Sequence, residues 1–404
     1  MKNHSLRMAV ALALCAVHFF LHAQTASPSI DTGALDMQEE IVRITVTAKD
    51  FFGRQATRPI PITIYRPDGN GPHPFVVFNH GRAPGDKRAS QTRYRPEHAA
   101  RYFVAKGFVV FVPMRLGYGE TYGDFDPEYS GTCRSSFSIE AMSVAASDQI
   151  MAVTAYAHSL PYVDATRWLV VGQSVGGLAA VATVGRKPKG LMGGINFSGG
   201  TGGDPDHNPM NPCAPQRMTD YWGTLASPGA PPMLWLYWQN DKYWGPNHPQ
   251  TWHKAWATGG ATSDFKSFPP AGTDGHSGLS IDMNSWLPVV DDFLNKLGFS
   301  QAAIVSQPPE STFAAFSNID NLPTSNSGKA AYAKFLASRL PRAFAIGERG
   351  GWGFSVGDYA MGKAIGHCQR SGQRCKLYAV GNDVVWQPLV SDGKSRESPA
   401  IITP

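Results

Sequence analysis

Apolar and polar residues alternate in two stretches near the start of the chain, Ile41–Ala48 and Ile60–Tyr65. A period of two is typical of strands with one buried face, and the turn at Gly53 joins the stretches, so we expect an antiparallel hairpin. Short, continuously apolar runs follow, separated by longer segments such as the Ala-rich Ala141–Ala157. The runs are Phe75–Phe78, Phe108–Pro113, Trp168–Val171, Gly193–Asn196 and Met233–Trp238. Strands buried on both faces, with helices between them, predict an α/β fold with a mostly parallel sheet.

The pattern changes after a last expected helix over Asp282–Leu297. The residues that follow are rich in Pro, Ser and Asn and show no period, which is typical of a linker. Beyond them the pattern predicts a helix, a strand, a helix and a hairpin: Gly328–Leu340, Ala343–Ile346, Tyr359–Gln369, and Lys376–Val380 with Val384–Trp386. We therefore expect a large α/β domain over residues 38–298, a linker over 299–327 and a small α+β domain over 328–404.

The N-terminus has the pattern of a secretory signal peptide. Lys2 and Arg7 precede the apolar run Met8–Leu21, and small residues suited to cleavage follow. We expect residues 1–23 to be removed and the protein to be secreted or periplasmic. An uncleaved anchor is the alternative; a lipoprotein anchor at Cys15 is disfavoured because a bulky leucine precedes it.

Charge and composition limit the partners. The chain has 36 Lys and Arg and 31 Asp and Glu; two of the basic residues and no acidic residue lie in residues 1–23, so 34 basic residues remain after cleavage. There is no run of Lys or Arg, and no later segment is apolar for the length of a bilayer. We expect no nucleic-acid partner and, after cleavage, no membrane partner. Metal-binding spacings such as CxxC or HExxH are absent, so we expect no metal and no cofactor.

Four cysteines remain after cleavage, and an even number in an oxidising compartment favours disulfides. Three pairings are possible. Cys368 and Cys375 lie close together in the sequence, so we expect them to pair, which leaves Cys133 to pair with Cys213.

The stretch "WLVVGQSVGGLAA", Trp168–Ala180, contains the main candidate for chemistry. A buried strand ends at Gly172, Ser174 follows, and small residues suited to a close-packed helix begin at once. A G-x-S-x-G sequence between strand and helix is typical of a sharp turn that exposes a nucleophilic serine. The alternative is a structural tight turn. We interpret Ser174 as the nucleophile.

A serine nucleophile needs a base and a residue that orients the base. Asp241 follows the apolar run Met233–Trp238, at the expected carboxyl edge of the sheet, and His276 lies in a Gly-rich loop before the last helix. We predict His276 as the base and Asp241 as its partner. The competing residues, which we interpret as structural or substrate-lining, are His207, His248, Asp204, Asp206 and Asp274.

The oxyanion of an acyl-transfer reaction needs N–H donors. The strand in "FVVFNHGRAPG" runs into His80-Gly81-Arg82, so we expect the backbone N–H groups of Arg82 and Val175 to converge near Ser174. His80 is expected to be a buried hydrogen-bonding residue. Side chains near strand ends are candidates to line the substrate site: Arg115, Tyr118, Trp238 and Trp244. The tryptophans around Asp241 are equally consistent with core positions.

These motifs, in this order, resemble those of α/β-hydrolases, specifically secreted members of the dienelactone-hydrolase-related group. "PITIYRPDG" (Pro61–Gly69) and "PMRLGYGET" (Pro113–Thr121) add to the resemblance, which covers residues 38–298. It implies an eight-stranded hydrolase sheet and a Ser174–His276–Asp241 triad. Dienelactone hydrolases use a cysteine nucleophile, so their lactone substrate is not carried over. The C-terminal part resembles a small accessory domain of bacterial secreted proteins, and this implies no activity.

The function expected from the residues and the resemblance is a secreted serine hydrolase that cleaves a small-molecule or polymer carboxylic ester through an acyl-enzyme. Two alternatives remain open: a serine peptidase or amidase on the same sheet, and a binding module that does not catalyse a reaction.

Overall fold

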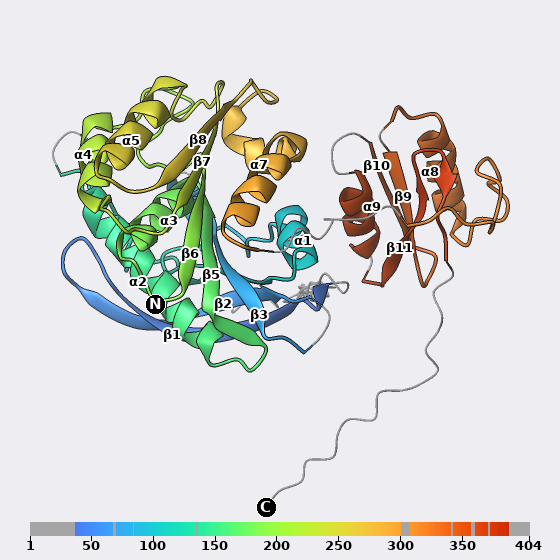
Figure 1. Cartoon of the computed structure of the whole chain (residues 1–404), viewed down its shortest axis with the longest axis horizontal. Coiled ribbons are helices and arrows are strands. Elements are labelled where there is room, and N and C mark those ends of the chain that lie inside the picture. The colour runs from blue at the N-terminus through green and yellow to red at the C-terminus, as the bar shows by residue number, and fades with distance from the viewer. Residues whose placement is uncertain are drawn as a thin grey trace, which may run out of the picture. The chain divides into compact units, whose positions relative to one another are not determined.

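The computed structural model describes residues 37–67, 70–83, 85–133, 136–299, 308–340, 342–356, 360–370 and 372–387. Within them the chain forms one eight-stranded and one four-stranded sheet, each with its own helices (Figure 1). The expected signal peptide, residues 1–23, lies outside the described residues.

The large sheet has the order β1-β2-β4-β3-β5-β6-β7-β8. Its strands are β1 Glu40–Lys49, β2 Gln55–Tyr65, β3 His73–Asn79, β4 Val109–Pro113, β5 Val163–Gln173, β6 Leu191–Phe197, β7 Met233–Trp238 and β8 Ser263–Phe268. β2 is antiparallel to β1 and to β4, and the strands from β4 to β8 are parallel to one another. The expected opening hairpin and the mostly parallel sheet are confirmed.

Burial along the strands follows their position in the sheet. Every residue of β4 and β7 is buried, as continuously apolar runs predict for inner parallel strands. The edge strands β1 and β8 alternate between more buried and more exposed residues. The inner strands are therefore packed against hydrophobic side chains on both faces, whereas the edge strands have one face toward solvent.

Helices cover both faces of the large sheet. Their bounds are α1 Glu97–Ala105, α2 Ile139–His158, α3 Val175–Gly185, α4 Pro215–Leu225, α5 Asn247–Thr258, α6 Gly278–Ile281 and α7 Met283–Lys296, with 3₁₀ turns η2 Gly85–Arg88, η3 Gly119–Thr121 and η4 Gly275–Ser277. The buried side chains of α2 to α5 share one hydrophobic cluster with the sheet, and those of α1, α6 and α7 share the other (Figure 1). Each face of the sheet thus has its own core.

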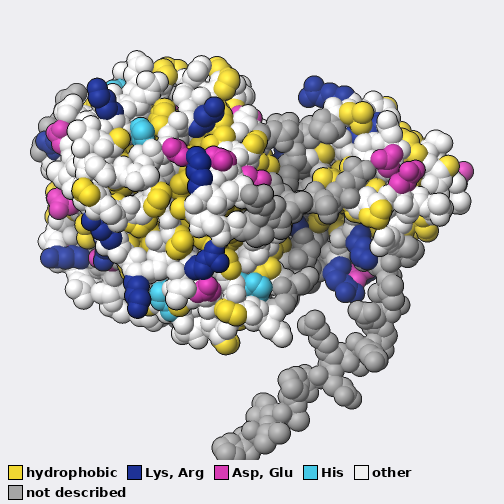
Figure 2. Space-filling model, viewed as in Figure 1, with side chains coloured by type: hydrophobic (Ala, Val, Ile, Leu, Met, Phe, Trp, Pro, Cys, Tyr) yellow, Lys and Arg dark blue, Asp and Glu magenta, His cyan; other side chains and the backbone are white. Residues whose placement is uncertain are grey.

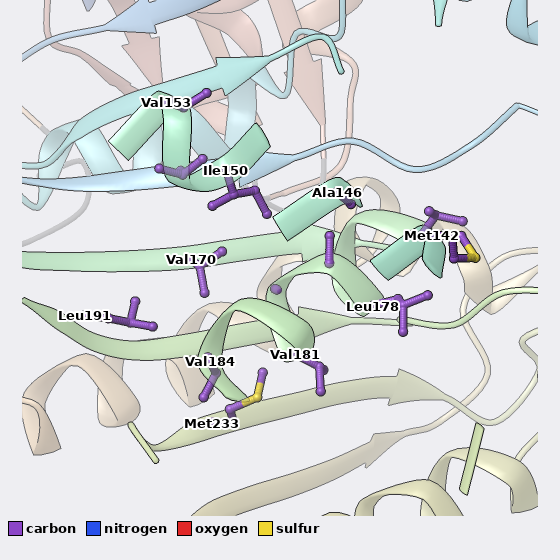
Figure 3. Close-up of a cluster of buried hydrophobic side chains, with 14 of the residues drawn as sticks. Met142, Ala146, Ile150, Val153, Val170, Leu178, Val181, Val184, Leu191 and Met233 are labelled. Atoms are coloured by element: carbon purple, nitrogen blue, oxygen red, sulfur yellow. The ribbon is translucent and has the colours of Figure 1, made fainter. Parts of the chain in front are cut away.

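The packing of α2 on α3 fixes the helix that begins next to Ser174. Ala146, Ile150 and Val153 recur at the three- and four-residue spacing of one helix face and lie in the same cluster as Leu178 and Val181 of α3 (Figure 3). Residues 175–184 of α3 are all buried, and many of them are glycine or alanine. Small side chains let α3 approach β3, β5 and β6 closely, so the start of this helix is rigidly placed.

The small sheet is antiparallel throughout, in the order β10-β9-β11-β12. Its elements are α8 Asn326–Leu336, β9 Arg342–Gly347, β10 Trp352–Val356, α9 Ala360–Gln369, β11 Cys375–Val380 and β12 Asp383–Val384. Strand β10 is not among the expected elements. It is short and follows a glycine-rich turn, and its place is set by Trp352 and Phe354, which stack with Phe344 of β9.

Part of the expected linker, residues 299–327, packs in the core of the small sheet. Leu322 is 4% exposed in the cluster around Tyr332, and the Tyr332 hydroxyl donates to the Phe316 carbonyl oxygen at 2.9 Å. The carboxyl-terminal half of that segment is therefore structured, because its few apolar residues reach a nearby core that the local sequence does not reveal.

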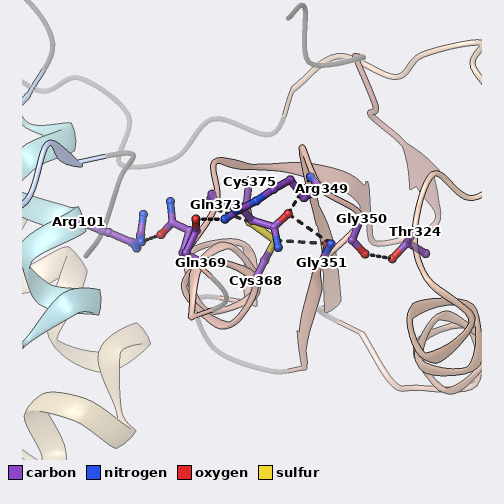
Figure 4. The surroundings of a disulfide bond; sticks show 10 residues. Arg101, Thr324, Arg349, Gly350, Gly351, Cys368, Gln369, Gln373 and Cys375 are labelled. Carbon is purple, nitrogen blue, oxygen red and sulfur yellow. Dashed lines mark hydrogen bonds between the residues drawn. A yellow bond between two sulfur atoms is a disulfide. The ribbon is translucent and has the colours of Figure 1, made fainter. Parts of the chain in front are cut away.

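Both expected disulfides, Cys133–Cys213 and Cys368–Cys375, are present, with Cα atoms 5.5 and 6.2 Å apart. Next to the second bond, the Gln373 side-chain oxygen accepts hydrogen bonds from the Arg349 N–H at 2.9 Å and the Gly351 N–H at 3.3 Å (Figure 4). The disulfide and this glutamine together join α9 and β11 to the turn between β9 and β10.

On the face drawn in Figure 2, basic side chains are scattered over the large unit, and several lie next to acidic ones. None of the helices in the described ranges has the length and apolarity that a bilayer crossing requires.

Candidate active site

Ser174 stands between β5 and α3, in the turn that the sequence predicts. Its backbone has φ 57° and ψ −125°, a conformation that costs a residue with a side chain about 1–3 kcal/mol. The Ser174 N–H donates to the Phe197 carbonyl oxygen at 3.0 Å, and the Gly200 N–H donates to the Ser174 carbonyl oxygen at 3.1 Å. The end of β6 and the loop after it thus hold the serine in its strained turn.

The flanking glycines are required by close approach of other backbone. A Cβ atom on Gly172 would lie 2.0 Å from the Gly176 carbonyl oxygen, and one on Gly176 would lie 2.3 Å from the Asn79 carbonyl oxygen. Both distances are far inside van der Waals contact. The G-x-S-x-G spacing therefore lets α3 begin directly against β3 and β5.

Ser174 lies at the point in the sheet where the helices that follow two neighbouring strands pack on opposite faces. Helix α1 follows β3 on one face of the sheet, and α3 follows the neighbouring β5 on the other. In open α/β sheets the crevice at the carboxyl ends of two such strands is where ligands bind. The strand order, together with this serine turn after β5, decides the fold of the unit. The large unit has the α/β-hydrolase fold.

Asp241 and His276 lie side by side in this α/β-hydrolase unit. The His276 Nδ1 atom is 3.0 Å from Asp241 Oδ2 and 3.2 Å from Oδ1, and Asp241 is fully buried. An ionised carboxylate only accepts hydrogen bonds, so Nδ1 carries the proton and Nε2 is left as the acceptor. Asp241 Oδ1 also accepts from the N–H groups of Tyr243 at 2.8 Å and Trp244 at 3.2 Å. The carboxylate is therefore fixed before it orients the ring.

The loop that carries His276 is tied to its surroundings on two sides. Asp274 Oδ1 accepts from the His276 N–H and from the Lys242 N–H, both at 3.0 Å, so this side chain joins the His276 and Asp241 loops. The side-chain amide of Gln173 donates to the His276 carbonyl oxygen at 2.9 Å. Asp274, a competitor for the acid role in the sequence, acts here as a cap.

The Tyr243 ring stacks on the His276 ring, with centroids 3.9 Å apart and planes 26° apart. Trp244 meets the same imidazole edge-on at 5.5 Å. Sequence reasoning missed Tyr243. Its position two residues after Asp241 is the only signal for it, and stacking across loops cannot be derived from spacing.

A pocket of about 350 Å³ opens beside Ser174. Its wall includes the Cys133–Cys213 disulfide, which links the loops after β4 and β6. The other main lining residues are Arg82, Phe137, Val175, Tyr243 and Trp244. Trp244 touches the pocket but is only 1% exposed and also belongs to the hydrophobic core, so its role toward substrate stays a prediction. Within the described residues, no cluster of three or more His, Cys, Asp or Glu side chains is arranged to hold a metal ion.

The two predicted oxyanion donors both lie at this pocket. Arg82 and Val175 line it, and a Cβ atom on Gly81 would lie 3.1 Å from the Ser174 Cβ. Neither the Arg82 nor the Val175 backbone N–H donates to an acceptor in the described part of the chain. These N–H groups are therefore available to an oxygen bound in the pocket.

Ser174 and His276 are not joined by a hydrogen bond in the described residues. They are linked indirectly: Gln173, next to Ser174, holds the His276 carbonyl oxygen, and Tyr243 both lines the Ser174 pocket and stacks on the His276 ring. Serine–histidine contacts are often longer in free enzymes than in substrate complexes.

Three expected substrate-lining residues lie in the interior, and these expectations are wrong. Arg115 and Tyr118 are fully buried: the Arg115 Nε donates to Glu128 Oε1 at 2.5 Å, and the Tyr118 hydroxyl donates to Glu128 Oε2 at 2.5 Å. Trp238 is only 1% exposed because α6 packs on its ring, and its indole N–H donates to Asp282 Oδ2. A strand-end position predicts the edge of the sheet, but not which loop closes over it.

His80 is a buried hydrogen-bonding residue, as expected. Its Nδ1 donates to the Gly81 carbonyl oxygen at 2.7 Å, and its Nε2 accepts from the Arg115 N–H at 3.1 Å. Burial, with the positive charge of Arg115 added, holds the pKa of His80 well below its usual 6.5. The imidazole is therefore neutral and fixes the loop that leads to Arg82.

The other competing histidines do not approach Ser174. His207 pairs with Asp204 at 3.0 Å on the surface, where its side chain is 84% exposed, and His248 stacks on Trp252. Most tryptophans near Asp241 are core residues, in agreement with the alternative interpretation that they occupy core positions. These buried ones are Trp222, Trp235, Trp252 and Trp256.

No family model matches the chain, and no curated protein matches its sequence. Solved structures are similar in fold. A Klebsiella pneumoniae protein assigned as a dienelactone hydrolase is 18% identical with a TM-score of 0.42, over 64% of this chain and 99% of that one. Est1E from Butyrivibrio proteoclasticus, solved with ferulic acid, is 15% identical with a TM-score of 0.42, over 59% and 96%. A puromycin-hydrolysing peptidase from Mycobacterium tuberculosis is 15% identical with a TM-score of 0.42, over 64% of this chain and 40% of that chain.

Proposed function

We propose that the protein is a serine hydrolase that cleaves carboxylic esters, with Ser174 as nucleophile, His276 as general base and Asp241 as the residue that orients the base. One observation carries the proposal. A serine in a positive-φ turn lines a pocket whose wall includes Tyr243, and this tyrosine stacks on a histidine that is hydrogen-bonded to a fully buried aspartate.

In the first step the Ser174 oxygen forms a bond to the ester carbonyl carbon while the hydroxyl proton passes to His276 Nε2. This nitrogen is the acceptor because Nδ1 donates to Asp241. Negative charge develops on the carbonyl oxygen, and the unpaired N–H groups of Arg82 and Val175 are suited to receive it. Such a donor contributes about 3–4 kcal/mol in hydrolases.

The tetrahedral intermediate collapses when the alcohol leaves with the proton from His276, and an acyl group stays on Ser174. Water then attacks this acyl-enzyme, gives its proton to His276, and releases the acid as Ser174 is reprotonated. Buried Asp241 stabilises the imidazolium in both halves without itself taking the proton.

We also propose that the protein works in an oxidising compartment. Its two disulfides support this, because such bonds persist outside the cytosol. One of them forms part of the wall of the Ser174 pocket, so it acts on the shape of the site.

The test uses the full chain and p-nitrophenyl acetate. We expect Ser174→Ala to lower kcat by roughly 10⁴–10⁶-fold and to abolish labelling by a fluorophosphonate probe. Ser198→Ala is the matched control: this serine also has a positive φ, 46°, but its hydroxyl is buried and lies outside the pocket. Ser198→Ala should keep both the hydrolysis of p-nitrophenyl acetate and the labelling by the fluorophosphonate probe.

Labelling that survives Ser174→Ala would contradict the proposed nucleophile. Matched ester and amide substrates with the same acyl group test the leaving-group class. We expect hydrolysis of the ester at a rate far above that of the amide, and equal kcat/KM values would instead indicate an amidase or peptidase.

A further inference from the structure

The turn between β1 and β2 presents an aromatic side chain in a fixed position. Phe52 is 66% exposed, the most exposed large hydrophobic side chain in the described part of the chain. The Asp50 carboxylate, itself nearly buried, accepts from the Phe52 N–H at 3.0 Å, the Arg54 N–H at 2.8 Å and the Arg54 Nε at 2.7 Å. A buried carboxylate thus pins the turn, so the exposure of Phe52 does not come from a loose loop.

Two more rings complete an aromatic platform. The Tyr129 ring lies 5.8 Å from that of Phe52, with planes 17° apart, and Phe51 stands edge-on to both, at 5.2 Å from Phe52 and 5.8 Å from Tyr129. Edge-on packing of Phe51 holds the other two rings nearly parallel. We call these three residues the aromatic platform.

A groove of about 520 Å³ runs between the turn and the start of α2. It is lined by Phe51 and Phe52 on one side and by Val144 on the other, with exposed Lys49 and Glu140 at its rim. One rim residue donates hydrogen bonds, the other accepts them, and their charges cancel. Apolar surface rimmed by polar groups is typical of a ligand-binding groove.

This combination matches a neutral sugar ring. A pyranose presents C–H bonds on its faces, which pack on an aromatic ring, and hydroxyl groups at its edge, which both donate and accept hydrogen bonds. Because Lys49 and Glu140 balance each other and Asp50 is already paired with Arg54, the groove favours neither an anion nor a cation. Its polar rim favours a ligand with hydroxyl groups over a purely apolar one.

The groove and the Ser174 pocket are lined by residues that are neighbours in the chain. Ser130 and Phe137 line the Ser174 pocket, whereas their sequence neighbours Tyr129 and Ser138 belong to the platform and to the groove. The Ser138 N–H donates to the Ser130 carbonyl oxygen at 2.7 Å, so the groove residue Ser138 lies directly against the pocket residue Ser130. Because the two hollows are lined by neighbouring residues, a chain-like ligand bound in one of them extends toward the other.

We infer that this groove is a subsite for a neutral sugar unit of an esterified glycan whose ester group enters the Ser174 pocket. The inference rests on the proposed ester hydrolysis, but it concerns a binding surface that no step of the reaction uses. It names the substrate class as polymeric carbohydrate esters.

Binding is tested without turnover by native electrophoresis of the Ser174→Ala protein in gels that contain xylan, galactomannan, mixed-linkage β-glucan or polygalacturonate. We expect retardation by at least one neutral glycan. Phe52→Ala and Phe52→Leu should abolish it, whereas Phe52→Tyr should restore it, because the platform needs an aromatic face. Ile41→Ala removes an exposed apolar side chain of β1 that does not line the groove; it is the control and should still be retarded.

Normal migration in every neutral glycan, or retardation by polygalacturonate alone, would overturn the inference, as would retardation that survives Phe52→Leu. Because this readout needs no catalysis, it stands apart from failure of the ester-hydrolase proposal. In the active protein, Phe52→Ala should raise KM for acetylated xylan by about tenfold and leave p-nitrophenyl acetate hydrolysis unchanged. Equal losses on both substrates would show that the turn supports the active site and not a sugar.

Discussion

Removal of the negative charge at Glu128 tests the interior ion pair that the sequence did not reveal. Glu128 and Arg115 are both fully buried, and they meet at 2.5 Å through Nε and 3.3 Å through Nη2. Glu128→Gln keeps the shape of the side chain but leaves the guanidinium of Arg115 buried without a counter-charge. Among the described residues the Arg115 Nη1 atom already has no hydrogen-bond partner, so the variant adds to an existing deficit.

The expected cost is about 3–5 kcal/mol in the free energy of unfolding, the range for removing one partner of a buried pair. Glu128 accepts from Tyr118 and from the Arg115 Nε through different oxygens, and the single glutamine oxygen can accept from only one of these two donors, which adds to the loss. The double variant Glu128→Leu with Arg115→Met removes both fully buried charges and leaves Arg82, which lies 3.8 Å from Glu128 and is partly exposed, to be solvated by water. It should lie within about 1–2 kcal/mol of the unchanged protein, because an uncompensated charge and not the missing contact causes the loss.

Urea unfolding followed by tryptophan fluorescence measures both effects. Eight of the ten tryptophans lie before residue 300, so the signal reports mainly the α/β-hydrolase unit. A loss below about 1 kcal/mol for Glu128→Gln would refute the reasoning, because it would mean that Arg115 needs no counter-charge. A double variant as unstable as the single one would refute it too, because then the contacts and not the charge would matter.

The same pair predicts a dependence on pH. Burial alone would raise the pKa of Glu128, but the charge of Arg115 and its hydrogen bonds outweigh burial, and the pKa lies below its usual 4.5. In the unfolded chain, Glu128 therefore takes up a proton near pH 4.5, whereas in the folded chain it takes up this proton only at a lower pH. The contribution of Glu128 is complete above pH 4.5 and is lost as pH falls through the lower, folded pKa. Glu128→Gln should lack this part of the acid loss.

Three further predictions follow from the site and its support. Gly176→Ala should destabilise the fold by about 1–3 kcal/mol because its Cβ would lie 2.3 Å from backbone, whereas Gly223→Ala, with its nearest neighbour at 3.9 Å, should be neutral or stabilising by up to about 1 kcal/mol in the same urea assay. Tyr243→Leu should lower kcat by about tenfold through a less well-held His276 ring, and Tyr243→Phe should keep it; equal kcat values would exclude a positioning role for the stacked ring. Burial lowers the pKa of His80, so below pH 6.5 unfolding takes up a proton, and each unit by which the pH is lowered should cost up to about 1.4 kcal/mol of stability. His80→Gln should flatten this slope, and an unchanged slope would contradict the neutral buried imidazole.

The residues of the candidate site could be named from the sequence because the connection between chain position and sheet edge is simple. In a parallel sheet every strand ends at the same edge, so Ser174 after β5, Asp241 after β7 and His276 after β8 lie at that edge whatever the helices do. The disulfide pairs followed from an even cysteine count and one short separation.

Side-chain burial near those strand ends was decided only by the tertiary structure. Arg115 and Tyr118 follow β4 as Arg82 follows β3, yet Glu128 closes over them from a later loop and turns both into interior residues. Tyr243 reaches His276 from a different loop, and no local pattern encodes that contact.

The sequence alone thus determined the type of sheet, the serine turn and the order of the three proposed catalytic side chains. Each of these depends on periodicity or on steric limits within a few residues. The tertiary structure decided which neighbouring polar residues face the pocket, where Phe52 and Tyr129 meet, and how β10 joins the small sheet. Those outcomes depend on contacts between segments far apart in the chain, whose energies no local pattern contains.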